Sequence, residues 1–295
     1  MKLCVIGLGT MGAPIARNLI DAADQLSVSA SRSEAFAELE TAGAKACADP
    51  TEAAAGSEIL FLCLPDGKAV QQTLDTVETA LAPGALVVDL GTTAHDETMA
   101  IAARLAARGL RFVDAPISGM KKRAEDATLT VMCGGAAADV EGLRPYLERI
   151  GETILHMGPT GSGQLTKLVN QLLFDINAAA LGEILTLAVK VGLDPEQVER
   201  VINTGTGRSY ASEFFAPRIL DGNFGDGYPM GAAYKDLISA ARLSADRALP
   251  VPVLAAATAV YQKALIEGHA DKDKGAMILP YEAALGVRFR RAKGS

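Results

Sequence analysis

The first nineteen residues, MKLCVIGLGTMGAPIARNL, limit the possible folds of this chain more than any other segment. A short apolar run at residues 3–6 is typical of a buried β-strand, and glycines follow it at Gly7, Gly9 and Gly12. After Gly12 the apolar residues recur at helical spacing. Strand, glycine turn and helix in this order predict a dinucleotide-binding unit. A purely structural turn is the alternative that glycine spacing alone leaves open.

Each glycine of this turn has a predicted task. Gly7 permits the tight turn, Gly9 lets the backbone approach a pyrophosphate, and Gly12 lets helix and strand pack closely. The helix N-terminus would offer N–H groups and the positive end of its dipole to the phosphates. The predicted cofactor site therefore takes in the whole turn, which consists of Gly7, Leu8, Gly9, Thr10, Met11 and Gly12.

The end of the second predicted strand, at residues 26–30, bears on which dinucleotide binds. Chains that bind NAD usually carry an acidic residue about 20 residues after the glycines, where it meets the ribose 2′-hydroxyl. This chain has Ser31 and Arg32 there instead. A guanidinium would pair well with a 2′-phosphate, so the sequence predicts NADP, with NAD also possible. The alternative is that Arg32 is an ordinary solvated residue.

The composition excludes several other classes of protein. The chain has 295 residues, of which 49% are hydrophobic and 21% charged, as in globular proteins. A net charge of -7 argues against a nucleic-acid partner. No apolar run predicts a membrane span, and a strand that begins at residue 2 leaves no room for a signal peptide. We therefore expect a cytoplasmic protein with no membrane partner.

The cysteines and histidines suggest neither disulfides nor a metal site. Cys4, Cys47, Cys63 and Cys133 have no paired spacing and are expected as reduced, mostly buried thiols. The three histidines are widely spaced, so no metal site is expected.

Strand-like and helix-like segments alternate through the first half of the chain. This alternation predicts an α/β fold with a Rossmann-type, doubly wound parallel sheet, which we assign to a domain at residues 1–160. Helical stretches such as 33–42 and 97–107 separate the strands. The predicted strands are residues 3–6, 26–30, 58–62, 85–89, 111–114 and 128–132.

Ligands of such sheets bind at the carboxyl ends of the strands. Three of these ends carry residues that could form a ligand site, which are LCLPD at 62–66, DLGTT at 89–93 and DAPISG at 114–119. Each could be an ordinary turn, but their shared position at one edge favours a binding site.

The pattern changes after a cluster of Gly, Pro and Ser at residues 158–163. A helical pattern of roughly 30 residues follows to about residue 191, and no strand alternation appears later. The sequence therefore predicts an all-α C-terminal domain at residues 161–295. A helix this long and apolar should be covered on several sides, by its own domain or by another subunit. Further helices are expected at 194–202, 212–220, 230–248 and 252–267.

Lys167 lies near the start of the long helix and is a candidate proton donor. Asn170 and Gln171 follow it by three and four residues, so both flank the helix face that carries Lys167. A lysine and an amide among apolar neighbours at a domain boundary suit proton transfer and substrate holding. Taken alone, a lysine in a first helical turn is more often a solvated charge.

Four motifs in order make the chain resemble the β-hydroxyacid dehydrogenase family, which includes 3-hydroxyisobutyrate dehydrogenase, tartronate semialdehyde reductase and the glyoxylate/succinic semialdehyde reductases. The motifs cover nearly the whole chain. They are GLGTMGAPIARNL at residues 7–19, DAPISG at 114–119, GSGQLTKLVNQ at 161–171 and YKDL at 234–237.

This resemblance implies roles for the substrate-side residues. Lys167 would be the catalytic general acid/base, Ser118 and Gly119 would hold the substrate carboxylate, and Asn170 would orient the substrate. Gln171 stands where some relatives have Asn and would supply a side-chain amide contact.

The same resemblance implies cofactor contacts and an assembly. Leu64, Pro65 and Thr92 would line the nicotinamide half of the site, and Lys235 would reach the cofactor from the helical domain, with Asp236 beside it. The long helix would make a homodimer, which could pair further into a tetramer.

Residues 118–129, SGMKKRAEDATL, depart from the common family pattern and resemble the glyoxylate/succinic semialdehyde reductase branch. Arg123 replaces a proline there and could meet an anionic or larger polar substrate; alternatively, residues 121–123 are a solvated charged turn. Tyr228 stands where relatives often have Phe near the substrate, and a packing role fits it equally well.

These observations predict an oxidoreductase that transfers hydride between NADP(H) and a small hydroxyacid or semialdehyde. The candidate substrates are 3-hydroxy acids, glyoxylate and succinic semialdehyde. An imine reductase on the same scaffold is the enzymatic alternative, but such relatives tend to lack the lysine. A non-catalytic NADP-binding module is the alternative from another class.

Overall fold

The structure is a computed structural model that describes residues 1–31 and 34–291. It divides into two compact units, Met1–Lys167 and Leu168–Ser295, and each is described here by itself. Residues 161–167, which the sequence assigns to the helical domain, fall in the first unit. The predicted domain limits of 1–160 and 161–295 stay a prediction.

The first unit is built on one β-sheet, which has nine strands within the described residues. The strand order is β3-β2-β1-β4-β5-β6-β8-β7, and β9 pairs with β8. The chain therefore starts in the middle of the sheet, adds β2 and β3 on one side of β1, and then adds β4, β5 and β6 on the other side. Open α/β sheets bind ligands at this change in strand order, between β1 and β4. The strands are β1 (Lys2–Ile6), β2 (Gln25–Ser29), β3 (Lys45–Ala46), β4 (Ile59–Leu62), β5 (Leu86–Asp89), β6 (Arg111–Asp114), β7 (Ile117–Ser118), β8 (Leu129–Gly134) and β9 (Gly151–Gly158).

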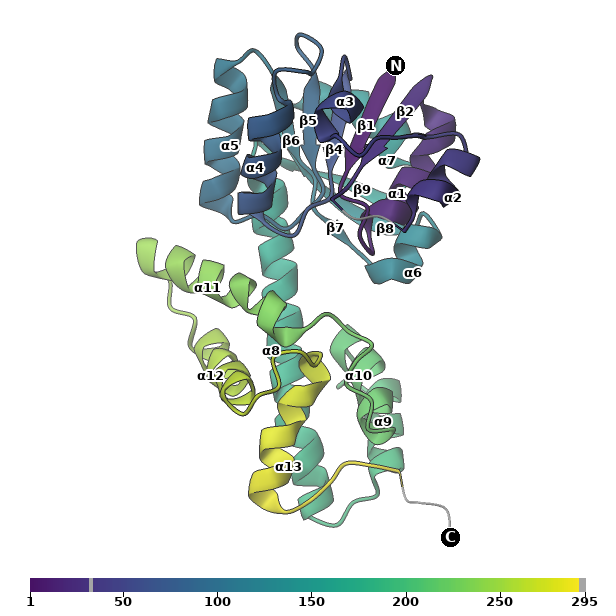
Figure 1. Cartoon of the computed structure of the whole chain (residues 1–295). Coiled ribbons are helices and arrows are strands. Elements are labelled where there is room, and N and C mark those ends of the chain that lie inside the picture. Colours follow the sequence, from purple (N-terminus) through teal and green to yellow (C-terminus); the bar gives the residue numbers. More distant parts are fainter. Residues whose placement is uncertain (32–33, 292–295) are drawn as a thin grey trace. The chain divides into compact units, whose positions relative to one another are not determined.

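Helices cover both faces of this sheet, because successive side chains of a strand point to opposite faces (Figure 1). Leu3 and Val5 of β1 enter one buried cluster, and Cys4 and Ile6 enter the other. The helices of the first cluster are α1 (Gly12–Leu19), α2 (Phe36–Thr41), α6 (Met120–Glu125) and α7 (Ala137–Leu147), and those of the second are α3 (Pro50–Ala54), α4 (Gly67–Val77) and α5 (His95–Ala107). The predicted doubly wound α/β fold is confirmed.

The six predicted strands are present with ends displaced by at most two residues, but one edge of the sheet differs from the expectation. β8 runs antiparallel to both β6 and β7, so the sheet is not parallel throughout. Only residues 119–128 join β7 to β8, and a parallel crossover needs a dozen residues or more. The strands β3, β7 and β9 were missed because β3 and β7 have two residues each and β9 is mostly exposed.

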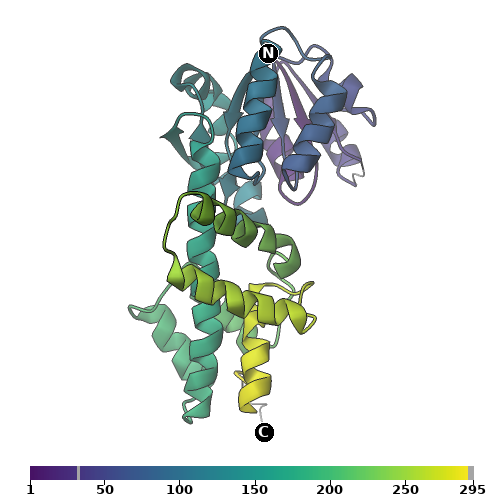
Figure 2. The same ribbon diagram turned by 90° about the vertical axis from the view of Figure 1, so that its left-hand side faces the viewer.

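The second unit is helical around its own buried cluster, which includes Phe215, Leu237, Tyr261 and Ile278 (Figure 2). Through Arg291 its β-type pairing is limited to an isolated bridge between Pro229 and Asp273. The predicted helices are found, and the short elements η2 and α13 were not expected. Its helices are the greater part of α8 (Ser162–Lys190), α9 (Pro195–Thr204), α10 (Tyr210–Leu220), α11 (Met230–Asp246), α12 (Pro252–Ile266), η2 (Lys274–Ile278) and α13 (Leu279–Leu285).

The helix α8, with 29 residues, is long and apolar enough to cross a membrane by length and composition. Its most apolar window has a mean hydropathy of 1.7, and 44% of that window is buried. These are weak grounds for a membrane span, because the core helix of a soluble protein meets the same criteria.

Candidate active site

The glycine turn after β1 has two glycines that packing requires and one that faces open space. A Cβ on Gly12 would lie 1.8 Å from the Gly7 carbonyl oxygen, and a Cβ on Gly7, whose φ is +100°, would lie 2.4 Å from the Cys63 oxygen. A Cβ on Gly9 would meet no atom within 4 Å. Backbone at Gly9 is therefore open to a ligand, as the predicted pyrophosphate contact requires.

The start of α1 suits an anion. Met11 is the residue before the helix, and no side chain caps the helix N-terminus. Leu8 is buried, whereas Gly9 and Thr10 are exposed. Uncapped N–H groups beside exposed backbone fit the phosphates of a dinucleotide.

The two residues predicted to select NADP lie just after β2. The Ser29 carbonyl oxygen accepts a hydrogen bond from the Gly7 N–H at 2.9 Å, which ties the end of β2 to the glycine turn. Ser31 is exposed two residues beyond it. Arg32 lies outside the described residues.

The loop after β4 packs against the glycine turn that follows β1. Leu64 is half-buried, Pro65 is exposed, and the Leu64 side chain would lie 3.0 Å from a Cβ on Gly7. Asp66 ends the loop by accepting a hydrogen bond from the Ala69 N–H at 2.8 Å, which caps α4.

The loop after β5 is held by the buried carboxylate of Asp89. Asp89 accepts hydrogen bonds from the Gly91 N–H at 2.9 Å and from the Thr93 hydroxyl at 2.6 Å. Thr92, predicted to face the nicotinamide, lies between these two residues and is half-buried. The loop that presents Thr92 is thus fixed at both sides by one carboxylate.

The neighbouring carboxylate, Asp114 at the end of β6, holds the start of α8. It accepts hydrogen bonds from the Gly161 N–H at 2.7 Å and the Gln164 N–H at 2.9 Å, which are among the N–H groups that a helix leaves unsatisfied. Burial raises the pKa of Asp114 to about 6, although these hydrogen bonds oppose the shift. The sequence singled out the segment 114–119 but gave Asp114 itself no task.

Close packing at the start of α8 explains its Gly-x-Gly pattern. A Cβ on Gly163 would lie 2.3 Å from the Met132 carbonyl oxygen and 2.7 Å from the Asp114 carbonyl oxygen. Gly161 has a φ of +90°, and its Cβ would lie 2.8 Å from His95 Nε2. The first turn of α8 is therefore seated directly on the ends of β6 and β8.

Gln164, which the sequence analysis missed, connects the start of α8 to the loop after β5. Its Nε2 donates to the Gly91 carbonyl oxygen at 2.9 Å, and its Oε1 accepts from the Thr93 N–H at 3.1 Å. A lone glutamine in a helical pattern gives no sequence signal of such a task. Its position three residues before Lys167 is the one hint the sequence offers.

Lys167 is the sixth residue of α8, in its second turn, and is 7% exposed. Its burial argues against the alternative of a freely solvated charge, because a lysine is rarely buried without a structural or chemical reason. Asn170 is exposed and Gln171 half-buried, and both belong to the second unit. Gln171 donates to the Asp236 carboxylate at 3.3 Å.

A buried polar cluster lies near Gln171 in the second unit. Asp175 and Lys274, which are 1% and 3% exposed, form an ion pair there. The Tyr261 hydroxyl is also buried. Burial raises the pKa of Asp175 to about 6, while the Lys274 charge opposes that shift.

The predicted carboxylate-binding segment follows β6. Ser118 and Gly119 are half-buried, and Gly119 has a φ of +144°, which favours glycine. The Arg123 side chain packs against Gly119, and its guanidinium donates to the Thr128 carbonyl oxygen just after α6 (Met120–Glu125). Arg123 thus closes its own turn, and its role toward a substrate stays a prediction.

The remaining predicted residues lie on or before α11. Lys235 is half-buried and adjacent to Asp236, which is 5% exposed. Tyr228 is 54% exposed, which does not suit a packing role within the chain.

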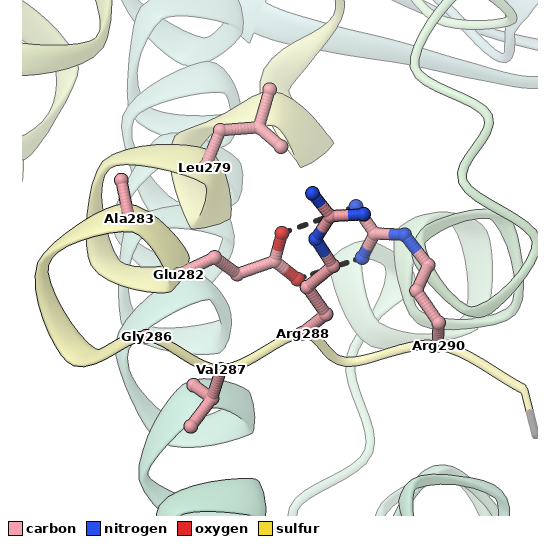
Figure 3. A pocket seen from close by; sticks show the side chains of 7 residues that line it. All are labelled: Leu279, Glu282, Ala283, Gly286, Val287, Arg288 and Arg290. Atoms are coloured by element: carbon pink, nitrogen blue, oxygen red, sulfur yellow. Dashed lines mark hydrogen bonds and ion pairs between the residues drawn. The ribbon is translucent and has the colours of Figure 1, made fainter.

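The second unit has a pocket of about 680 Å³ formed by α13 and the residues that follow it. Figure 3 shows Glu282 there with Arg290, whose guanidinium donates to both carboxylate oxygens at 2.7 and 3.1 Å. Leu279, Ala283 and Arg288 also line it. It contains no predicted site residue.

Two family models match the chain in succession. Residues 2–158 match the NAD binding domain of 6-phosphogluconate dehydrogenase. Residues 161–281 match the model described as NAD-binding of NADP-dependent 3-hydroxyisobutyrate dehydrogenase.

Known proteins are similar along nearly the whole chain. The 2-(hydroxymethyl)glutarate dehydrogenase of Eubacterium barkeri is 36% identical, over 97% of this chain and 97% of its own. The structure of Mycobacterium tuberculosis 3-hydroxyisobutyrate dehydrogenase with L-serine superimposes with a TM-score of 0.85 at 28% identity, covering 95% of this chain and 98% of that one. An imine reductase from Pseudomonas sp. has a TM-score of 0.59 at 20% identity, covering 95% of this chain and 99% of its own, which shows a shared fold alone. The chain therefore belongs to the β-hydroxyacid dehydrogenase family and is an NAD(P)-dependent oxidoreductase of the 3-hydroxyisobutyrate dehydrogenase type.

Proposed function

We propose that this protein interconverts the primary alcohol of a 2-substituted 3-hydroxypropanoate and the corresponding semialdehyde, with NADP(H) preferred over NAD(H). The observation that carries the proposal is the buried Lys167 near the start of α8. Both 2-(hydroxymethyl)glutarate and L-serine, named for the two relatives, carry a primary alcohol β to a carboxylate. They differ in the substituent on the carbon between these groups.

The proposed chemistry needs one proton-transfer group and a carboxylate anchor. The nicotinamide, when bound, accepts or supplies the hydride. In the reductive direction the Lys167 ammonium stabilises the developing alkoxide and gives it a proton; in the oxidative direction the neutral amine takes the hydroxyl proton. Ser118 and Gly119 hold the carboxylate, and Asn170 and Gln171 orient the substrate.

The residues present fit a dinucleotide. Gly9 leaves open space beside the uncapped start of α1, which suits a pyrophosphate. Leu64, Pro65, Thr92 and Lys235 complete the proposed cofactor contacts. NADP preference is supported by Ser31 and Arg32 in place of an acidic residue, and by the description of the family model that matches residues 161–281.

The test is oxidation of NADPH and NADH against glyoxylate, succinic, tartronate and methylmalonate semialdehydes and one cyclic imine. We expect turnover of tartronate or methylmalonate semialdehyde, faster with NADPH. Turnover of glyoxylate or succinic semialdehyde alone would contradict the proposed substrate class. Lys167→Ala should lose most of kcat with little loss of NADPH affinity. Lys121→Ala, which removes an exposed lysine paired with Glu125, is the matched control and should behave as wild type.

Other outcomes would favour the alternatives. Reduction of the imine alone would favour an imine reductase, and NADPH binding without any turnover would favour a non-catalytic module. Near-wild-type kcat in Lys167→Ala would remove the lysine from the mechanism. For the cofactor, Arg32→Asp should move preference toward NAD, and unchanged preference would contradict the proposed role of Arg32.

We further propose a homodimer formed through α8. Four apolar residues on this helix and Val191 just after its end, each at least 49% exposed, recur at the spacing of one helical stripe. A stripe of this kind is typical of a helix–helix contact. Measuring the mass of the protein in solution would also show whether two dimers pair into a tetramer. The residues are Val169, Leu173, Ile184, Leu187 and Val191. A cytoplasmic location stays a prediction.

A further inference from the structure

The Gln164 side chain has both of its polar atoms bonded to one loop. Its Nε2 donates to the Gly91 carbonyl oxygen at 2.9 Å, and its Oε1 accepts from the Thr93 N–H at 3.1 Å. Gln164 is 3% exposed, so neither bond competes with bulk water. A carboxamide is suited to this task because it offers a donor and an acceptor on one planar group.

The backbone of the same residue is bonded to the neighbouring strand end. The Gln164 N–H donates to Asp114 Oδ2 at 2.9 Å, while Asp89 holds the far side of the Gly91–Thr93 loop. Asp89 and Asp114 are paired residues of β5 and β6. Gln164 therefore joins two adjacent strand ends and the first turn of α8.

We propose that Gln164 is a positioning residue that fixes Lys167 relative to the loop of Thr92. Thr92 lies between the two residues that Gln164 binds, and Lys167 lies three residues after Gln164, about one turn further along the same side of α8. This inference rests on the proposed function, in which Lys167 transfers the proton and Thr92 faces the nicotinamide. Gln164 acts through these groups and transfers nothing itself.

The cap of α8 alone does not account for the side chain of Gln164. Asp114 already binds the N–H groups of Gly161 and Gln164, and any residue other than proline at position 164 would supply the second of these N–H groups. The carboxamide adds only the link to the β5 loop. Loss of that link should move Lys167 relative to the cofactor loop, and a misplacement of about 1 Å can cost about 100-fold in rate.

The first test is Gln164→Met, which keeps the volume and removes both side-chain hydrogen bonds. We expect kcat to fall about 10- to 100-fold, while the KM for NADPH and the fluorescence-measured Kd for NADPH change less than about threefold. Hydrogen exchange should rise in the peptide that contains the Thr93 amide. The matched control is Thr166→Val, which removes a hydrogen bond to the Ser162 carbonyl oxygen in the same turn and should leave these quantities unchanged.

A second variant separates positioning from simple loss of stability. In Gln164→Glu the protonated side chain can donate to Gly91 and accept from Thr93, whereas the carboxylate can only accept. The kcat of Gln164→Glu, divided by that of wild type at each pH, should rise as the pH falls. The ratio for Gln164→Met should stay flat, since the ionisable groups around position 164, which are Asp89, His95, Asp114 and Lys167, are present in both proteins.

Each result decides between the two proposals. A kcat of Gln164→Met within twofold of wild type, with Lys167→Ala inactive, would overturn the positioning role and leave the proposed function standing. A raised KM with unchanged kcat, or a pH-independent Gln164→Glu ratio, would also overturn it. A wild-type protein that turns over no acid aldehyde would overturn both.

Discussion

Asp89 and Asp114 are register partners at the carboxyl ends of the paired strands β5 and β6, and each carboxylate holds a different segment of the candidate active site. Asp89 fixes the loop of Thr92 through Gly91 and Thr93. Asp114 fixes the start of α8. Two side chains that touch neither predicted ligand thus set the positions of the residues that would.

The first prediction concerns the pH dependence of stability at Asp114. Its pKa of about 6 in the folded protein lies above the ordinary value near 3.9, so the folded state binds the proton more tightly. The contribution of this group to stability is therefore present at low pH and falls as the pH rises from about 4 to about 6. Asp114→Asn removes the titration, so its free energy of unfolding relative to wild type should rise by about 1–3 kcal/mol over that range.

Urea unfolding of both proteins between pH 4 and 7.5 would measure this difference. The Asn variant should also be less stable than wild type at pH 4, because Asn cannot accept both hydrogen bonds. Asp175 is present in both proteins, so its titration cancels. A difference that stays constant with pH would contradict the prediction.

A matched pair of glycine substitutions should separate packing from cofactor binding. Gly12→Ala places a Cβ 1.8 Å from the Gly7 carbonyl oxygen, so we expect a loss of more than about 3 kcal/mol or failure to fold. Gly9→Ala meets no protein atom, so its stability should stay within about 1 kcal/mol of wild type. Its Kd for NADPH should rise about tenfold or more, because the new methyl group occupies the space assigned to the pyrophosphate.

Thermal unfolding and fluorescence titration with NADPH would measure both effects. Gly142→Ala, at an exposed position of α7 with nothing within 4 Å and no positive φ, is a control for loss of glycine alone. Unchanged NADPH affinity in Gly9→Ala would contradict the assignment of the turn.

Removing one partner of the buried ion pair of Asp175 and Lys274 should lower the free energy of unfolding strongly, whereas replacing both partners by apolar residues should not. Lys274→Met leaves the Asp175 charge uncompensated, so we expect a loss of about 3–5 kcal/mol. The double variant Asp175→Leu/Lys274→Met should recover most of this loss, because it buries no charge. Chemical denaturation of the three proteins at pH 7.5 would show the recovery, and additive losses would contradict the pairing.

The exposed stripe on α8 makes the oligomeric state testable. Leu187→Glu puts a charge in the middle of the stripe and should convert a dimer to a monomer at micromolar concentration. Sedimentation equilibrium would measure the mass, with Gln72→Glu on an exposed part of α4 as the control. A wild-type protein that is already monomeric would refute the proposed dimer.

The sequence was sufficient for the fold class because β1, the glycine turn and α1 form a local pattern that needs no distant partner. Lys167 was singled out through the resemblance of residues 161–171 to a family motif, and its catalytic role stays a prediction. The direction of β8 was not predictable in this way. It depends on how few residues separate β7 from β8, and β7 has only two residues of its own.

Gln164 and Asp114 show what sequence reasoning missed at the candidate site. Their tasks arise from contacts across 47 to 73 positions of the chain, between a helix start and two strand ends. Neither residue type is unusual where it stands. That the carboxylate of Asp114 lies opposite the first N–H groups of α8 can be seen only in the folded sheet, where β6 ends beside the start of that helix.

The boundary between the two compact units falls inside α8, after Lys167. A gene exchange at that point would leave the lysine with the sheet and transfer Asn170 and Gln171 with the helices. Ser118 and Gly119, the proposed carboxylate holders, would stay with Lys167, while the proposed orienting amides would come from the other parent. Such a chimera would therefore show how much of the choice among acids depends on the helices alone.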